Sequence, residues 1–358
     1  SDHFRKVARG IYESYLNRLN KNLSSDSTTD GLSEKIRDLK KERIKLQTEK
    51  NEYNCWLREN ARDELLLEKF VDSITTVKPF TPPAAIPSKK SERECVLLFG
   101  DAHDGVEFEI KGLFGETLNK YNPEIFERRM WELLDDTLKY IEREKIDTLN
   151  VFELGDFSEG VLRVGQLMRL KYGVVDSTVH YEEFISTWLN ELTKYVKVKF
   201  QMVFGNHSEL RFFNQPKGSF GDENMGKVVA AYIKQRLSGN PNFTYIENPT
   251  GLIFANVCDY NFLGIHGEVK DMKKALEDFS LFYKVNINYI AGGHLHHSES
   301  EEIGVDCEAI RVSSIMGIDP FSKSLIRSAN AGAKILCFER GAGITDEHRV
   351  KLGRGENS

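Results

Sequence analysis

The spacing of apolar residues changes near residue 90 of this 358-residue chain. Up to residue 77 they recur every three to four positions, which predicts helix almost throughout. The segment from Glu34 to Ile74 contains no Gly or Pro, and its apolar positions fit an interrupted 3.5-residue repeat. This pattern is typical of a coiled coil or helical hairpin. Two arrangements satisfy it: a helix packed on the rest of its own chain, or a helix paired with another chain.

A proline-rich stretch separates this helical arm from the rest of the sequence. Four of the nine prolines lie at positions 79, 82, 83 and 87. Closely spaced prolines cannot sustain a helix, and they favour an extended, semi-rigid linker. We therefore predict a helical arm at residues 1–77, a linker at 78–92 and a second domain at 93–358.

Beyond the linker, short apolar runs alternate with helical patterns. The runs that read as buried strands cover residues 96–99, 149–154, 198–204, 261–265 and 287–291. Helical patterns lie between them at 123–144, 181–195, 224–237 and 271–283. Two further candidate strands follow, at 302–312 and 334–339. This alternation predicts an α/β domain.

Composition narrows the picture in three respects. The net charge of -6 and the sequence pI of about 5.9 argue against a protein that coats nucleic acid through bulk charge. No apolar run approaches the roughly 18 residues that a membrane helix needs. The five cysteines are far apart and include no CxxC pair, which argues against a disulfide framework or a zinc ribbon. A reducing cytoplasm is the expected location.

Each of the five predicted strands is followed by side chains that bind metals or handle protons. The residues concerned, in chain order, are Asp101, His103, Asp156, Asn206, His207, His266, His294 and His296. In open α/β sheets, sites form at the carboxyl ends of the strands, so these side chains are expected to converge. A lone histidine is more often structural than a ligand, but six of the nine histidines, the five named above and His297, fall in these strand-end clusters.

The donor types indicate the metal chemistry. Carboxylate, amide and imidazole ligands without thiolate suit Mn, Fe, Zn or Mg. Seven ligands are too many for one tetrahedral ion and suit two ions about 4 Å apart that share a carboxylate. The competing interpretation is one structural zinc, which usually has cysteine ligands and leaves Asp101, Asp156 and Asn206 unexplained.

The order of these motifs resembles that of the calcineurin-like metallophosphoesterases. That order is Asp-x-His, Gly-Asp-x-x, Gly-Asn-His, a later His and Gly-His-x-His, and all five motifs occur across residues 100–297. The resemblance implies a four-layer αββα sandwich and two divalent ions, with manganese the commonest and iron, zinc or magnesium as alternatives. It implies that the first ion is held by Asp101, His103 and His296, the second by Asn206, His266 and His294, and both by Asp156.

The resemblance also implies that His207 stabilises the transition state or protonates the leaving oxygen. Two departures from the family pattern bear on function. Ser208 stands where the family usually has an acidic residue that orients this imidazole. The motif Gly-Asp-Phe-Ser-Glu-Gly lacks the arginine of the protein Ser/Thr phosphatases, which argues against that branch.

Three functions fit the sequence. The first is a DNA or RNA nuclease, similar to SbcD-like members of the family, with nucleic acid meeting Arg163, Arg211 or the basic arm. Residues 1–90 carry a net charge of +4 against -10 for the remainder. The second is a phosphodiesterase or phosphomonoesterase for small molecules such as cyclic nucleotides. The third is a scaffold whose arm recruits a partner or a second copy of the chain.

Overall fold

The computed structural model describes residues 9–10, 12–18, 35–50, 74, 76–87, 92–160, 166, 168–209, 224–324 and 329–353. The chain divides into two compact units, residues 1–71 and 72–358. In the first unit, residues 9–10, 12–18 and 35–50 are helical, as their apolar spacing predicts. The remaining positions of the predicted arm lie outside the described residues. The boundaries at residues 77 and 92 stay predictions.

The second unit contains a six-stranded sheet with the order β13-β12-β1-β4-β5-β6. Its strands are β1 (Arg93–Phe99), β4 (Thr148–Glu153), β5 (Lys197–Met202), β6 (Phe243–Tyr245), β12 (Gly332–Glu339) and β13 (Gly343–Lys351). The four strands from β1 to β6 are parallel, and β12 and β13 add an antiparallel edge. Strands β1 and β4, in the middle of this sheet, are buried along most of their length, which accounts for their continuous apolar runs.

A five-stranded sheet faces the first, with the order β10-β11-β9-β8-β7. Its strands are β7 (Ile253–Val257), β8 (Tyr260–Ile265), β9 (Tyr289–Gly292), β10 (Glu299–Gly304) and β11 (Cys307–Arg311). Apolar side chains from both sheets fill the space between them, and the ring centroids of Phe152 and Phe262 lie 5.4 Å apart. A separate hairpin, β2 (Phe108–Lys111) and β3 (Thr117–Tyr121), follows β1.

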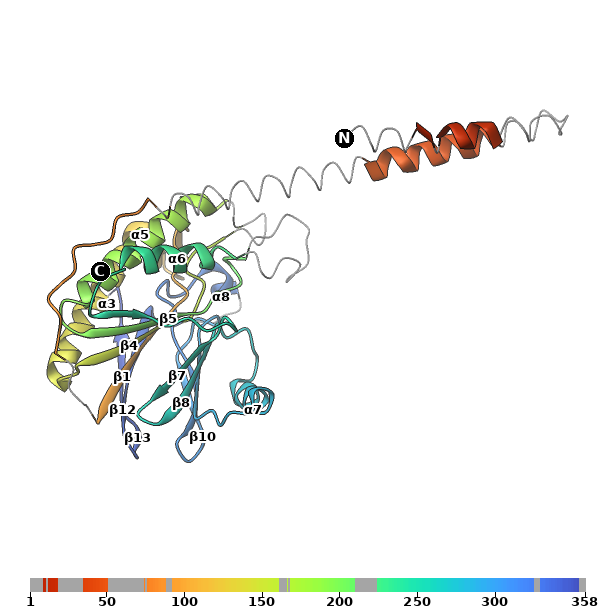
Figure 1. The fold of residues 1–358 in the computed structure, drawn as a ribbon. Coiled ribbons are helices and arrows are strands. Elements are labelled where there is room, and N and C mark those ends of the chain that lie inside the picture. The colour runs from red at the N-terminus through yellow and green to blue at the C-terminus, as the bar shows by residue number, and fades with distance from the viewer. Residues whose placement is uncertain are drawn as a thin grey trace. The chain divides into compact units, whose positions relative to one another are not determined.

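Helices cover the outer faces of both sheets (Figure 1). Helices α3 (Pro123–Glu144), α5 (Val174–Leu192) and α6 (Gly226–Arg236) lie on the six-stranded sheet, and α7 (Met272–Tyr283) packs on the other. The indole of Trp188 donates a hydrogen bond of 2.7 Å to the carbonyl of Met130, which joins α5 to α3. The predicted αββα arrangement is therefore confirmed. No helix in the described part of the chain is both long and apolar enough to cross a bilayer.

Each predicted strand overlaps an observed one, but β2, β3, β6 and β7 were not predicted, and the tail differs in two further respects. The single strand predicted at 302–312 is a hairpin of β10 and β11 that turns at Val305 and Asp306, where Asp306 has a φ of 48°. The pattern did not reveal this turn because charged and apolar residues alternate through it. Strand β13 was not predicted either, because its exposed edge carries several charged side chains.

The proline-rich stretch is extended, as predicted, and it is also fastened to the second unit. The Phe80 amide donates a 2.9 Å hydrogen bond to the carbonyl of Arg236, whose guanidinium lies 3.9 Å from the centre of the Phe80 ring. Further along, the Ile86 amide donates to Asn242 Oδ1 at 2.8 Å. Residues 76–87 therefore belong to the packed surface of the domain and do not act as a free spacer.

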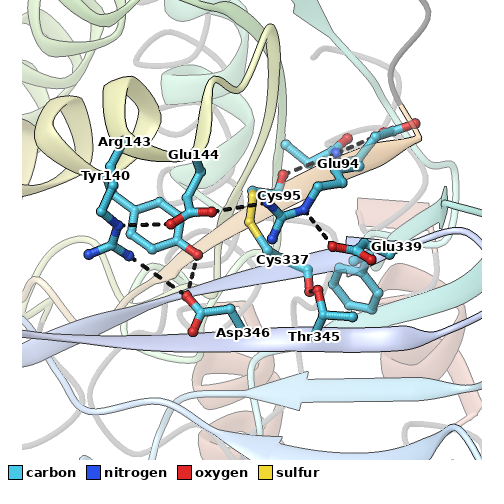
Figure 2. The surroundings of a disulfide bond; sticks show 12 residues. Glu94, Cys95, Tyr140, Arg143, Glu144, Cys337, Glu339, Thr345 and Asp346 are labelled. Atoms are coloured by element: carbon cyan, nitrogen blue, oxygen red, sulfur yellow. Dashed lines mark hydrogen bonds and ion pairs between the residues drawn. A yellow bond between two sulfur atoms is a disulfide. The ribbon is translucent and has the colours of Figure 1, made fainter.

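A disulfide joins Cys95 on β1 to Cys337 on β12 (Figure 2). The two residues pair directly across the antiparallel strands, with their Cα atoms 4.2 Å apart. They are 242 residues apart in sequence, so no cysteine spacing signals the bond. The wide spacing of the cysteines argued against a disulfide framework, so this bond was not predicted. Among the described cysteines, Cys258 and Cys307 are free.

We expect peptide mapping to show this bond. When the protein is alkylated and digested without reductant, the peptides that contain Cys95 and Cys337 are expected to appear as one cross-linked species in mass spectrometry. Those that contain Cys258 and Cys307 serve as the internal control and are expected to be alkylated. Alkylation of Cys95 and Cys337 under the same conditions contradicts the assignment.

Candidate metal centre

The predicted ligands meet where strands of the two sheets end. Strands β1, β4 and β5 lead into the first three motifs, and β8 and β9 of the facing sheet lead into the last two. The structure forms one group of potential ligand atoms within 4.8 Å of one another from Asp101, His103 and His296, and another from Asp156, His266 and His294. Asn206 Oδ1 lies 3.1 Å from His266 Nε2 and so adjoins the second group.

The second group has more hydrogen-bond acceptors than protons. His266 Nδ1 lies 2.8 Å from the carbonyl of Leu154 and donates to it, which turns Nε2 toward the centre. That Nε2 atom lies 2.9 Å from Asp156 Oδ2, 3.1 Å from Asn206 Oδ1 and 3.0 Å from His294 Nδ1. One imidazole proton cannot satisfy all three neighbours. A cation bound between His266 Nε2 and these three neighbouring atoms would satisfy all four.

The first group leaves buried polar atoms without partners. Asp101 Oδ2 accepts the backbone amide of His294 at 2.8 Å, but Asp101 Oδ1 has no hydrogen-bond partner among the described residues. The same holds for His103 Nε2 and His296 Nδ1. Asp101 and His103 are 0 % and 2 % exposed. Buried polar atoms of this kind usually bind a partner, and the donor set of carboxylate and imidazole fits a divalent cation.

The backbone at these ligands is strained. Of the ten described non-glycine residues with positive φ, five are predicted ligands: Asp101, His103, Asp156, His294 and His296. Residues other than glycine rarely adopt this backbone conformation, which costs about 1–3 kcal/mol per residue. Such strain persists where the surrounding structure fixes the geometry, as it does at functional sites. The sharp turns bring side chains from i and i+2 positions of one loop onto the same centre.

Two glycines make this close approach sterically feasible. A Cβ atom on Gly205 would lie 1.9 Å from Asp156 Oδ1, and one on Gly155 would lie 2.8 Å from His266 Nδ1. Gly155 also has a φ of 92°, which only glycine adopts without strain. Gly155 and Gly205, which precede Asp156 and Asn206, therefore leave room for the ligands of neighbouring loops.

Charge in the cluster is unevenly distributed. Burial opposes the charge on His266, but Asp156 outweighs burial and raises the pKa of His266 to about 10. Burial and the charge on His266 lower the pKa of His294 to about 4. Without a cation, protons on some of the imidazoles therefore balance the buried carboxylates. Because a metal ion competes with these protons, metal affinity is expected to rise with pH.

His207 lies beside the two groups with a fixed ring orientation. Its Nδ1 donates to the backbone carbonyl of Glu159 at 2.6 Å, and its amide donates to Asp156 Oδ1 at 2.9 Å. Nε2 lies 3.9 Å from Asp156 Oδ2. Ser208 does not orient the ring, because its hydroxyl donates to the carbonyl of Gly205. The orienting group that the sequence analysis found missing after His207 is thus supplied by the Glu159 backbone.

Glu159 is a site residue that the sequence analysis did not identify. Its side chain is 5 % exposed, and Oε2 lies 3.0 Å from His103 Nδ1. Glu159 Oε1 accepts Gln166 Nε2 at 3.1 Å and lies 3.5 Å from an Arg169 nitrogen. A carboxylate behind a ligating histidine fixes its ring and raises its basicity. The signal in the sequence that could have identified Glu159 was an acidic residue three positions after Asp156, in the same loop.

A second buried carboxylate, that of Asp104, fixes the loop that carries the first motif. Asp104 is fully buried, and its Oδ2 lies 2.6 Å from His180 Nδ1 on α5. The other ring nitrogen of His180 lies 2.9 Å from Glu127 Oε1 on α3. The hydrogen bond to Asp104, followed by its charge, outweighs burial and raises the pKa of His180 to about 9. This chain of groups ties the Asp101–Asp104 loop to both helices.

The predicted substrate contacts cannot be placed in the same way. Arg163 and Arg211 lie outside the described residues. Their roles therefore stay predictions, as do the assignments of individual ligands to each ion.

Taken together, two facing sheets with a candidate dimetal centre at their strand ends define a metallophosphoesterase-like fold. The chain is 33 % identical over 331 residues to the SPbeta prophage-derived protein YonJ of Bacillus subtilis strain 168, covering 89 % of this chain and 80 % of that protein. The chain belongs to the YonJ family. Residues 35–77 match the model of the YonJ coiled-coil domain, in agreement with the coiled coil predicted there.

Solved structures with low sequence identity are also similar. A dimetal phosphatase from Danio rerio is 10 % identical, with coverage of 72 % of this chain and 99 % of that one and a TM-score of 0.36. Vps29 from Entamoeba histolytica, in its complex with zinc, is 12 % identical at the same coverage, with a TM-score of 0.32.

Replacing Asp156 by Asn is expected to weaken metal binding. The amide removes the negative charge that faces His266, so manganese retained after dialysis is expected to fall from about two ions per chain to one or fewer. Elemental analysis of the purified variant measures this. Asp278→Asn, on the exposed surface of α7, is the matched control and is expected to retain the wild-type content. Wild-type metal content in Asp156→Asn contradicts the placement of this carboxylate in the centre.

The His180 contacts are expected to make stability depend on pH. The folded-state pKa of His180 is about 9 against an ordinary value of 6.5, so its contribution is complete below pH 6.5 and is lost as pH rises through 9. His180→Gln is expected to lower the free energy of unfolding by about 2 kcal/mol at pH 6 and by much less above pH 9. Urea denaturation across this range measures the difference.

For comparison, Glu127→Gln removes only the more exposed partner of His180 and is expected to have a smaller effect. A difference between wild type and His180→Gln that does not change with pH argues against the charged form of His180.

Proposed function

We propose that the protein is a phosphoester hydrolase that works with two divalent metal ions. The observation that supports this best is the pair of adjoining donor groups at the strand ends, with buried atoms that lack partners. In this proposal Asp101, His103 and His296 hold one ion, Asn206, His266 and His294 hold the other, and Asp156 is shared. When bound, two such ions activate water and neutralise the charge of a phosphate undergoing in-line displacement.

The residues of the chain supply orientation and proton transfer. Glu159 holds the ring of His103, and its backbone carbonyl fixes the tautomer of His207 by accepting from Nδ1. His207 Nε2 is then directed toward the centre, where it can hold a proton for the leaving oxygen. Its side chain is 16 % exposed, so it remains accessible from the solvent side.

Manganese is the proposed metal, with iron, zinc and magnesium as alternatives. Donors that are all oxygen or imidazole suit each of these ions, whereas thiolate-preferring metals are not favoured. Among the described residues, the groups of candidate ligands contain no cysteine.

We further propose nucleic acid as the substrate, in analogy with the SbcD-like nucleases that the motifs resemble. Two features support a polymeric anion: the basic balance of residues 1–90 and the exposed Lys40, Lys41, Arg43 and Lys45 on the helix at residues 35–50. The prophage origin of the related YonJ protein is compatible with nucleic-acid processing. A small-molecule phosphodiesterase has the same metal requirement and is the second candidate.

The arm is proposed to pair with a second copy of the chain. Ile36, Ile44 and Leu46 are 46–67 % exposed on the helix at residues 35–50. A coiled coil needs a partner helix to cover such positions.

An activity panel tests the proposed function. With manganese, hydrolysis of bis-p-nitrophenyl phosphate is expected, together with cleavage of single-stranded DNA, duplex DNA or RNA in preference to cyclic nucleotides. His207→Ala is expected to keep its metal and lose about a hundredfold in kcat. His348→Ala, on β13 and outside the centre, is the matched control and is expected to retain activity.

Two results overturn parts of this proposal. Absence of hydrolysis of every ester by the metal-loaded protein removes the enzyme assignment and favours a scaffold. Preferential cleavage of cyclic nucleotides removes the nuclease assignment and leaves the hydrolase.

A further inference from the structure

A cavity of about 480 Å³ adjoins the candidate metal centre. His296 belongs to both: its side chain lines the cavity, and its Nε2 lies 3.8 Å from Asp101 Oδ1. A molecule whose phosphate reaches the centre can therefore place a neighbouring group in the cavity. The volume lies within the range of about 300–1,000 Å³ that is usual for pockets that bind organic ligands.

One wall of this cavity contains a buried guanidinium that is incompletely paired. Arg311, at the end of β11, is 5 % exposed. One terminal nitrogen, Nη2, donates to the carbonyls of Val269 and Lys270 at 2.9 and 3.2 Å, but Nη1 has no hydrogen-bond partner among the described residues. Glu299 approaches Arg311 Nε only to 3.9 Å. A buried charge without a close counter-ion is destabilising, so this wall favours an added anion.

Lys270 and His297 lie around the same space. Lys270 lines the cavity from the loop that Arg311 holds, and its side chain is exposed. His297 also lines it, with Nε2 3.4 Å from Glu299 Oε2. The carboxylate of Glu299 is thus shared between two distant partners, and its side chain is 57 % exposed. A ligand anion can take its place beside Arg311 while Glu299 turns to solvent.

The rest of the lining is mainly apolar. It consists of Leu295, Ile318 and Ala329, together with Ser322. An anion-binding side next to an apolar side suits a ligand that has a phosphate group and a flat or apolar body. A nucleotide has both features, whereas a small phosphomonoester has no group to occupy the second side.

We propose that this cavity is a second-anion subsite, which binds a phosphate next to the one that is hydrolysed. The substrate is then a nucleotide with two phosphates or a segment of an oligonucleotide. This inference rests on the proposed hydrolase function and narrows its substrate class. In the competing interpretation, Arg311 serves only to clamp the loop at residues 267–270.

Two chromogenic esters with the same leaving group test the subsite. Thymidine 5′-(p-nitrophenyl phosphate) has one phosphate, and its 3′-phosphorylated form has two. In the metal-loaded full chain, the second phosphate is expected to lower KM by about tenfold, which corresponds to about 1.4 kcal/mol. Lys270→Gln and Arg311→Gln are expected to remove most of this advantage. Lys273→Gln, exposed on the neighbouring helix α7, is the matched control and is expected to keep it.

Calorimetry provides a readout that does not need turnover. Thymidine 3′,5′-bisphosphate is expected to bind more tightly than thymidine 5′-monophosphate, by a ratio that falls in Lys270→Gln. Circular dichroism shows whether Arg311→Gln is folded; if it is not, Lys270→Gln, which changes an exposed side chain, carries the test.

The outcomes separate the two proposals. Equal binding of the two nucleotides by the wild-type protein overturns the subsite, as does an advantage that survives Lys270→Gln. If no ester is cleaved but the bisphosphate still binds more tightly through Lys270, the hydrolase proposal fails and the subsite stands.

Discussion

Burial of ionisable side chains at one edge of two facing sheets constrains the rest of the structure. Asp101 and Asp156 are almost completely buried, so their charges must be balanced by protons or by cations. The balance depends on imidazoles that come from both sheets: His103 follows β1 of the six-stranded sheet, and His266 and His294 follow β8 and β9 of the five-stranded sheet. The core between the sheets therefore determines the site: a shift of one sheet against the other separates carboxylates from their counter-charges.

The backbone strain lies in the ligand loops, and part of the support for these loops comes from helices α3 and α5. Five of the seven proposed ligands occupy left-handed backbone conformations, which persist only where the surrounding structure holds them. Glu159 and the Asp104–His180 pair supply hydrogen bonds that hold these loops in place. The helices α3 and α5 thus do more than cover a sheet. They carry Glu127 and His180, which hold Asp104 in the loop of the first motif, while Glu159 orients His103 in the way that outer carboxylates orient histidines in metalloproteins.

The sequence predicted the part of the site that lies on regular elements. The end of each buried strand was visible as an apolar run followed by glycine and a ligand, so Asp101, Asp156 and His266 could be placed at one edge. Glu159 and His180 could not, because their role depends on which side of a loop they face. The same limit applies to Cys95 and Cys337, whose pairing follows from strand order and not from spacing.

A metal centre and an anion-binding cavity that share His296 also suggest how such a protein distinguishes its substrates. The centre recognises any phosphate, because charge and coordination do not depend on the attached group. Discrimination between substrates then depends on the residues that lie beside the centre. Lys270 lies in the loop after β8 and Arg311 at the end of β11, so the proposed subsite is built on the five-stranded sheet, whereas the metal centre combines residues that follow strands of both sheets.

The disulfide between β1 and β12 closes a covalent ring that contains nearly all of the second unit, since 242 residues separate its two cysteines. The five-stranded sheet, every proposed ligand of the centre and the loops between them lie inside this ring, whereas β13 of the six-stranded sheet follows it. A single break in the backbone anywhere within it leaves two segments that are still chemically joined. The domain is thereby topologically protected, and damage to an exposed loop does not release a fragment until the bond is reduced.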